Sequence, residues 1–204
     1  MATLNSNDNT TIDMIKNECI DMIRKGNISG VLNCLGFVYE KNKDYENMKK
    51  FYDRAIDRGD DDAMYNMASY YNDIKDYENM IGYLLLAIEK GNSNAMFSMA
   101  NYCRDIKDYD NMIKYYLLAI EKKHSDAMNC MGIYYDNIKD YDNMKKYYNM
   151  AIDCGNSLSM YNMGLYYQEI KDYDNMKKYY NMAIENGSTE ATENLNHYYK
   201  YQIN

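Results

Sequence analysis

Apolar residues recur along this chain with a helical period, in pairs of stripes. In the clearest stretch they fall at positions i, i+3, i+4 and i+7, which places them on one face of an α-helix. The first stripe consists of Met64, Met67, Ala68 and Tyr71, extended by Ile74. The second stripe consists of Tyr77, Met80, Leu84, Ala87 and Ile88. The pattern therefore predicts two short helices joined by a tight turn.

This pair of stripes is repeated every 32 residues, as two separate markers show. The dipeptide Asp-Tyr occurs at Asp44-Tyr45, Asp76-Tyr77, Asp108-Tyr109, Asp140-Tyr141 and Asp172-Tyr173. The dipeptide Ala-Ile keeps the same step at Ala55-Ile56, Ala87-Ile88, Ala119-Ile120, Ala151-Ile152 and Ala183-Ile184. A single helical hairpin cannot bury its own apolar face, so neighbouring hairpins must stack.

The turns between the predicted helices carry their own signals. Asp76 is placed to accept a hydrogen bond from a free backbone N–H as the N-cap of the second helix. Glycine, which tolerates the left-handed conformation that ends a helix, closes the second helix at Gly59, Gly91, Gly155 and Gly187. In the third unit Lys123 stands at this position. We expect Lys123 to adopt the same left-handed conformation, at a cost in stability.

The fold class predicted from these signals is all-α: an α-solenoid of five 32-residue helix-turn-helix repeats. The repeats span about residues 29–187. Residues 10–25 are expected to form a leading helix and residues 189–201 a closing, capping helix with a polar outer face. Residues 1–9 are expected to be a disordered N-terminus. The domain prediction is therefore a single repeat domain over residues 10–201.

Composition and charge restrict the classes of function. The net charge of −8 argues against a nucleic-acid partner, because binding to phosphates requires a basic surface. No segment has the run of about 20 apolar residues that spans a bilayer, and the N-terminus does not resemble a signal peptide. Five unpaired-looking cysteines favour reduced thiols and a cytoplasmic location. The Asn, Lys, Ile and Tyr bias without proline suits an AT-rich genome, as in some protists or large DNA viruses; a viral protein would lie in the host cytoplasm.

The chemistry of the side chains predicts no enzyme, no cofactor and no metal site. The chain has two histidines, His124 and His197, and no Cys–His or Ser–His–Asp arrangement at interpretable spacing. No glycine-rich phosphate loop is present, and the run Asp60-Asp61-Asp62 is too short for a calcium loop. Paired tyrosines such as Tyr70-Tyr71 could stack on nucleic-acid bases. Their position on or beside the apolar stripe favours packing within and between repeats.

The residues of the second unit, AMYNMASYYNDIKDYENMIGYLLLAIEKG, resemble a tetratricopeptide repeat. Met64, Met67, Ala68 and Tyr71 match the family's first-helix positions, and Ala87 matches its second-helix alanine. The junction EKGNSNAMFSMA instead is similar to the Sel-1-like branch. The chain departs from the family in its 32-residue unit, its missing closing proline and its methionines at 48, 80, 112, 144 and 176, where alanine is common.

The resemblance implies that the outward face of each first helix lines a concave groove that binds a partner protein or peptide. Asparagine can donate to and accept from a peptide backbone, aromatic residues supply anchors, and the acidic residues favour a neutral to basic ligand. A solvated polar face is the plainer alternative. The groove positions are Tyr65, Asn66, Ser69, Asn72, Asp73, Phe97, Asn101, Arg104, Asp105, Asn129, Ile133, Asp136, Tyr161, Asn162, Leu165, Gln168 and Glu169.

Lysine pairs on the second helices give an alternative surface. They occur at Lys49-Lys50, Lys145-Lys146 and Lys177-Lys178. They are expected to form a solvated convex face or a surface for an acidic partner. The main functional prediction is an interaction scaffold that binds through the groove. The alternative is an architectural or substrate-adaptor subunit of a larger complex that uses the convex face, as the resemblance to Sel-1-like proteins implies.

Overall fold

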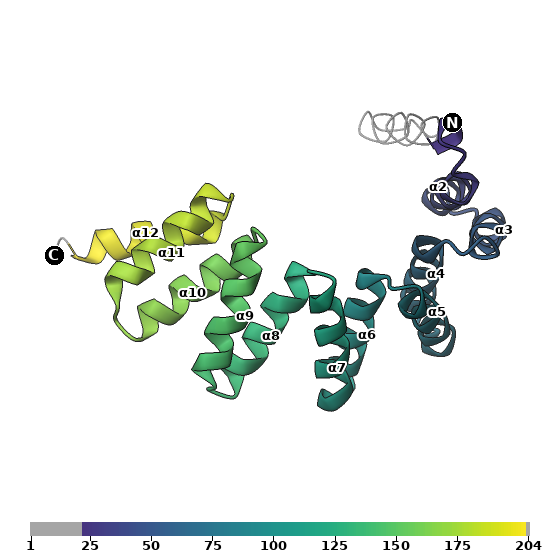
Figure 1. Ribbon diagram of the computed structural model, residues 1–204. Helices are drawn as coiled ribbons and strands as arrows, with labels where there is room; N and C mark the ends of the chain where they lie inside the picture. The colour runs from purple at the N-terminus through teal and green to yellow at the C-terminus, as the bar shows by residue number, and fades with distance from the viewer. Residues whose placement is uncertain (1–21, 203–204) are drawn as a thin grey trace. The chain divides into compact units, whose positions relative to one another are not determined.

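The computed structural model describes residues 22–202, and every regular element in that range is an α-helix. Ten of these helices form five consecutive hairpins, each with a first helix, helix A, and a second helix, helix B (Figure 1). The A helices are α2 (Ile28–Lys41), α4 (Asp61–Asp73), α6 (Ser93–Asp105), α8 (Ser125–Asn137) and α10 (Ser157–Glu169). The B helices are α3 (Tyr45–Ile56), α5 (Tyr77–Glu89), α7 (Tyr109–Glu121), α9 (Tyr141–Asp153) and α11 (Tyr173–Glu185). The closing helix is α12 (Thr189–Gln202).

The predicted fold class is confirmed, and the closing helix begins at the predicted residue. Residues 22–24 are helical, whereas the rest of the predicted leading helix and the predicted disordered residues 1–9 lie outside the described residues. The chain divides into two compact units, one up to Ser98 and one from Met99, and each is described by itself below. The single repeat domain over residues 10–201 therefore stays a prediction.

The apolar stripes form the core of each unit. Met48, Met80, Met112, Met144 and Met176, the positions where the chain departs from the family pattern, are all buried. Two members of the predicted stripes are exposed instead. Ile74 is 52% exposed because it is the C-cap of α4, where the chain already turns away from the hairpin. Tyr77 is 46% exposed because it is the first residue of α5.

The predicted aspartate caps are present at all five B helices, and asparagine strengthens them. In α5 the backbone N–H of Asn79 donates to Asp76 at 3.2 Å, and the Asn79 side chain donates to the same carboxylate at 2.7 Å. The other four caps have the same two hydrogen bonds, both donated by the asparagine to the aspartate carboxylate. Hydrogen bonds from the asparagine side chain and backbone lower the pKa of Asp44, Asp108, Asp140 and Asp172.

The turn between helix A and helix B depends on a left-handed lysine, which sequence reasoning did not find. In the second hairpin, Lys75 N–H donates to the Asn72 carbonyl and Asp76 N–H to the Tyr71 carbonyl, which is the Schellman closure of α4. This closure requires a positive φ at the residue after the C-cap. The lysines in this position are Lys43, Lys75, Lys107, Lys139 and Lys171, with φ between 59° and 63°.

The turn after helix B follows the glycine prediction, and its exception is confirmed. Gly59, Gly91, Gly155 and Gly187 have φ of 80° to 90°, and Lys123 has φ of 62° in the same position. Lys123→Gly should therefore raise the free energy of unfolding by about 1 kcal/mol, because a left-handed conformation costs a residue with a Cβ roughly that much. Thermal or chemical unfolding measures the gain. Lys123→Ala, which keeps the Cβ, is the matched control; equal stability of the two variants would contradict the argument.

His124 is the N-cap of α8 and makes that helix start sensitive to pH. Its Nδ1 accepts a hydrogen bond from the backbone N–H of Ala127 at 3.3 Å. The corresponding caps of α6 and α10 are asparagines, Asn92 and Asn156, which accept in the same way at 2.9 Å. Burial lowers the pKa of His124, and the nearby Asp126 opposes that shift. A protonated Nδ1 cannot accept, so the cap requires the neutral ring.

The His124→Asn variant should therefore flatten part of the pH dependence of stability. Because the folded-state pKa lies below the unfolded value of 6.5, the unfolded chain takes up a proton first as the pH falls. Stability contributed by neutral His124 is thus present above about pH 6.5 and decreases below it until the folded-state pKa is passed. The difference in melting temperature between His124→Asn and the parent should widen between about pH 7.5 and pH 5.5. Parallel curves would contradict this, and His197→Asn on α12 is the control.

Tyrosine pairs pack within and between hairpins, as the packing interpretation predicted. In the fourth hairpin Tyr135 stacks on Tyr147 with ring centroids 5.4 Å apart and an interplanar angle of 3°. Tyr141, at the start of α9, contacts Tyr166 of α10 at 5.5 Å. Equivalent contacts recur in both units. The tyrosine pairs are therefore part of the contacts that hold successive helices together.

Candidate functional site

The predicted groove residues lie on one set of positions of the A helices, which we call the A face. In the first unit these are Tyr65, Asn66, Ser69, Asn72 and Asp73 of α4, with Phe97 of α6. In the second unit they are Asn101, Arg104 and Asp105 of α6, Asn129, Ile133 and Asp136 of α8, and Tyr161, Asn162, Leu165, Gln168 and Glu169 of α10. The structure places most of them at partly or fully exposed positions, with Asn129 as the exception.

Part of the A face is used to join consecutive A helices to one another. In the first unit, the Asn66 amide donates to Asn33 of α2 at 2.9 Å, across 33 residues of sequence. In the second unit, Asn162 donates to Asn129 at 3.1 Å across the same separation. Asn194 of α12 donates to the hydroxyl of Tyr161 at 3.1 Å, again across 33 residues. In these three helix pairs, α2–α4, α8–α10 and α10–α12, a side chain of one helix thus bonds to the side chain 33 residues later on the following helix.

This arrangement removes Asn129 from the residues that a ligand could contact. Its side chain is buried, and its Oδ1 also accepts from the Ser159 hydroxyl at 2.9 Å. The prediction that Asn129 lines an open groove is therefore wrong, because α8 and α10 approach closely at this point and enclose it. Tyr161 is half-buried and stacks on Tyr180, so its ring also serves the packing of α10 on α11.

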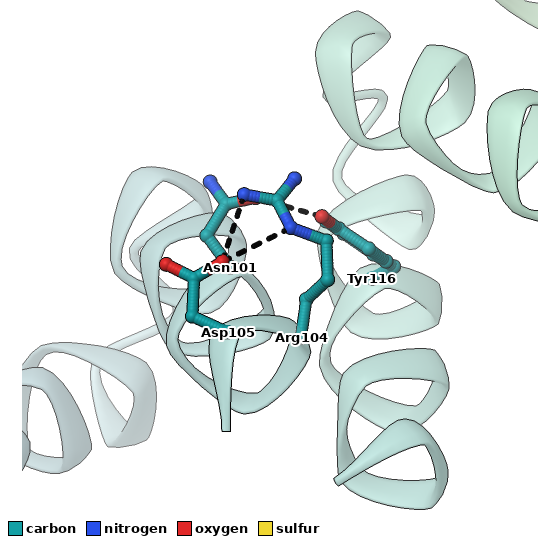
Figure 2. A network of polar contacts seen from close by, with 4 residues as sticks. All are labelled: Asn101, Arg104, Asp105 and Tyr116. Atoms are coloured by element: carbon teal, nitrogen blue, oxygen red, sulfur yellow. Dashed lines mark hydrogen bonds and ion pairs between the residues drawn. The ribbon is translucent and has the colours of Figure 1, made fainter. Parts of the chain in front are cut away.

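Buried tyrosines of the B helices also reach the A face, which sequence reasoning missed. Tyr116 of α7 is buried, and its hydroxyl donates to Asn101 of α6 at 2.7 Å (Figure 2). Figure 2 shows Arg104 next to this pair, held by its neighbour Asp105 at 3.2 Å. Burial is the main cause that raises the pKa of Tyr116. The hydroxyl is therefore a permanent hydrogen-bond donor on this face.

Two other buried B-helix tyrosines also donate a hydrogen bond to helix A, but to a residue further along that helix. Tyr180 donates to Gln168 at 2.7 Å and Tyr52 donates to Glu40 at 2.8 Å. Each of these two tyrosines packs against a glycine of helix A, Gly164 or Gly36, where a Cβ would lie 2.4 Å from the ring. The signal that could have revealed these contacts is a glycine in helix A followed by a tyrosine sixteen residues later.

Among the A-face residues that stay exposed, two apolar and two acidic side chains lie on the neighbouring helices α8 and α10. Ile133 and Leu165 are 41% and 38% exposed. Next to them along the same helices lie Asp136 and Glu169, again separated by 33 residues. Burial, followed by the neighbouring charge of Glu169, raises the pKa of Asp136. We call these four residues the α8–α10 patch.

No cation of the described residues balances the acidic pair of this patch. Arg104 pairs with Asp105 and Lys177 with Asp174, and within residues 22–202 neither Asp136 nor Glu169 takes part in a salt bridge. Two neighbouring carboxylates without a cation leave a negative potential beside two apolar side chains. Such a surface can bind a segment that offers a positive charge close to an apolar residue.

The lysines of the B helices are less available than the sequence suggested. Lys145 lies over the ring of Tyr166 at 5.0 Å, and Lys146 lies over the ring of Tyr147 at 5.1 Å. Lys177 and Lys178 lie in the same way over Tyr198 and Tyr179. Cation–π contacts of this kind add to the packing of the tyrosines. These lysines therefore contribute to the repeat framework.

In residues 22–202, no three His, Cys, Asp or Glu side chains come together in a group that could hold a metal ion. No helix within that range combines the length and the apolar character needed to cross a bilayer.

Comparisons with known proteins show what the repeat is similar to. The tetratricopeptide repeat family matches residues 31–58, 93–121 and 158–186, which correspond to the first, third and fifth hairpins. The solved Sel1 repeat protein from Oxalobacter formigenes is 21% identical, with a TM-score of 0.73 over 88% of this chain and 87% of that chain. A protective antigen of uropathogenic Escherichia coli with an SLR fold is 20% identical, with a TM-score of 0.68 over 84% of this chain.

The third structure, pilF of Pseudomonas aeruginosa, is 15% identical, with a TM-score of 0.63 over 91% of this chain and 96% of that chain. The present chain spans 41% of the Escherichia coli antigen. No curated protein sequence matches the chain. At these identities the structural likeness concerns the fold alone. The sequence match is to the tetratricopeptide repeat, and two of the similar structures are Sel1-like repeat proteins.

Proposed function

We propose that this chain, a helical repeat protein of the tetratricopeptide and Sel1-like type, is an interaction scaffold that binds a segment of a partner protein on its A face. Repeat proteins of this type generally serve protein–protein interaction. The segment is extended or helical and neutral to basic. The observation that carries the proposal is the α8–α10 patch, in which two unpaired carboxylates lie beside two exposed apolar side chains.

The patch favours a ligand with a lysine or arginine close to a leucine-like side chain. A basic group between Asp136 and Glu169 would relieve their mutual repulsion and form charge-assisted hydrogen bonds. Ile133 and Leu165 would bury an apolar side chain at the same time. Gln168 adds a polar contact, although its Oε1 already accepts from Tyr180. The hydrogen bond from Asn162 to Asn129 joins α10 to α8, and the one from Asn194 to Tyr161 joins α12 to α10, which supports a preformed patch.

Selection from a library of short random peptides displayed on phage tests this proposal. The full chain should enrich peptides that combine a basic with an apolar residue. Asp136→Asn with Glu169→Gln should weaken the selected peptides by about tenfold or more, since a hydrogen bond to a charged group contributes about 1.5–3 kcal/mol. Ile133→Ala with Leu165→Ala should weaken them as well.

The matched control removes the same charges from the B helices. Asp153→Asn with Glu185→Gln changes two exposed carboxylates of α9 and α11 and should leave peptide binding unchanged. Equal loss of binding in both double variants would show a general charge effect and would contradict the A-face site. Enrichment of acidic peptides would contradict the proposed ligand chemistry.

A further inference from the structure

Helix α5 differs from the other B helices on its outer face. At residues 81 and 82 it has isoleucine and glycine, where α3, α9 and α11 each have two lysines. Its Leu85 and Leu86 are 47% and 46% exposed. The residues that correspond to Leu85 and Leu86 in α3 are Asp53 and Arg54. Within the first unit, α5 therefore has an exposed apolar strip where α3 has a charged one. In the second unit α7 also has leucines at these positions, Leu117 and Leu118, and Leu117 is 39% exposed, so glycine at residue 82 is the feature that α5 alone has.

No contact within the described chain explains why residue 82 is a glycine. It lies in the interior of α5, where glycine costs about 1 kcal/mol relative to alanine. A Cβ at this position would meet no atom within 4 Å, so internal packing does not require glycine. The other four B helices have lysine here, at Lys50, Lys114, Lys146 and Lys178. An exposed glycine that internal packing does not require leaves room for the close approach of another molecule.

Gly82 and Leu86 belong to one row of exposed residues, spaced four apart along α5 and ending at its C-cap, Lys90. The row consists of Glu78, Gly82, Leu86 and Lys90. Residues at this spacing form a ridge that can pack into the corresponding groove of a second helix. We propose that α5 binds α5 of a second copy of this chain, in antiparallel orientation about a two-fold axis midway between Gly82 and Leu86.

The self-complementarity of the row is the argument for a second copy. About this axis, Leu86 of each copy faces Gly82 of the other, so a large side chain enters the space that a missing Cβ leaves. In the same register Glu78 of each copy faces Lys90 of the other, which gives two opposite-charge contacts at the ends of the strip. Such a reciprocal arrangement is the property of an isologous interface.

The pairing predicts a concentration-dependent dimer of the full chain, measured by analytical ultracentrifugation. Gly82→Lys and Leu86→Arg should each weaken dimerisation by about tenfold or more, because each puts a charge into the centre of the interface. Both changes introduce residues that this chain already has at the same positions of α3, Lys50 and Arg54, so the fold tolerates them. Lys50→Gly with Arg54→Leu, which makes the reverse exchanges on the surface of α3, is the control. It should leave dimerisation unchanged, and in its presence Gly82→Lys and Leu86→Arg should still weaken dimerisation.

Charge exchange tests the antiparallel register. Glu78→Lys alone would place like charges at both ends of the interface, and so would Lys90→Glu alone; each variant should be monomeric. A mixture of the two variants should form a heterodimer, because both end contacts then join opposite charges. A chain that is monomeric at all concentrations would overturn the proposal. So would a dimer that is insensitive to Gly82→Lys, or a mixture of the charge variants that stays monomeric.

This interface is independent of the A face, and the two proposals can fail separately. Asp136→Asn with Glu169→Gln should weaken peptide binding while dimerisation persists. Gly82→Lys should weaken dimerisation while peptide binding persists. If either variant removed both properties, the self-association through α5 would be contradicted.

Discussion

Replacing Met144 by alanine should lower the free energy of unfolding by about 3 kcal/mol, within the range of 2–5 kcal/mol known for such core truncations. Met144 is fully buried and packs with Tyr148 and Met163 in one core cluster. Alanine would remove the thioether and leave a cavity between two helices. Neighbouring tyrosines cannot fill it easily, because Tyr135 and Tyr167 are fixed by stacking on partners of their own.

Chemical denaturation of Met144→Ala measures this loss. Met144→Leu keeps nearly the same volume and should cost less than about 1.5 kcal/mol. Asn149→Ala, at an exposed position of the same helix, should change stability little. If Met144→Ala were as stable as Asn149→Ala, the two helices would be able to close the gap. The methionine would then fill space without determining the spacing of the hairpin.

The repeat and its helices were predictable because three local signals agree at every step. The apolar period, the aspartate at the start of helix B and the glycine at its end all recur with the same spacing. The left-handed lysines were not predictable in the same way. Lys75 and its equivalents have no special propensity for positive φ, and the short Schellman closure imposes it on them.

The candidate site was predictable only as a set of positions. Helical geometry shows that Asn129, Asp136 and Asn162 project from A helices on related faces. Which of them become buried depends on how closely consecutive A helices approach, and this is a tertiary property. The offset of 33 residues, one more than the repeat, brings Asn129 to Asn162 and Asp136 to Glu169. Asn129 and Asn162 hydrogen-bond to each other between the helices, whereas Asp136 and Glu169 remain on the surface.

Gly164→Ala should destabilise the protein by about 1 kcal/mol, the net of two opposing effects. A Cβ at residue 164 would lie 2.4 Å from the ring of Tyr180, and overpacking of this kind costs about 1–3 kcal/mol. The better helix propensity of alanine returns up to about 1 kcal/mol. The third hairpin shows how a chain of this type combines alanine with tyrosine. There Ala100 and Tyr116 are both buried, and the tyrosine hydroxyl donates to Asn101.

The hydroxyl of Tyr116 thus bonds to the residue directly after the alanine, whereas that of Tyr180 bonds to Gln168, four residues after the glycine. In the fifth hairpin the residue directly after the small position is Leu165, which offers no side-chain acceptor. Gly164→Ala should therefore be rescued by Leu165→Asn, which recreates the Ala-Asn pair of the third hairpin. In a double-mutant cycle by chemical denaturation, the double variant should be more stable than the sum of the single changes, by about 1 kcal/mol for the restored hydrogen bond. Strict additivity would show that the tyrosine does not redirect its hydroxyl, and that the glycine of helix A is needed for space alone.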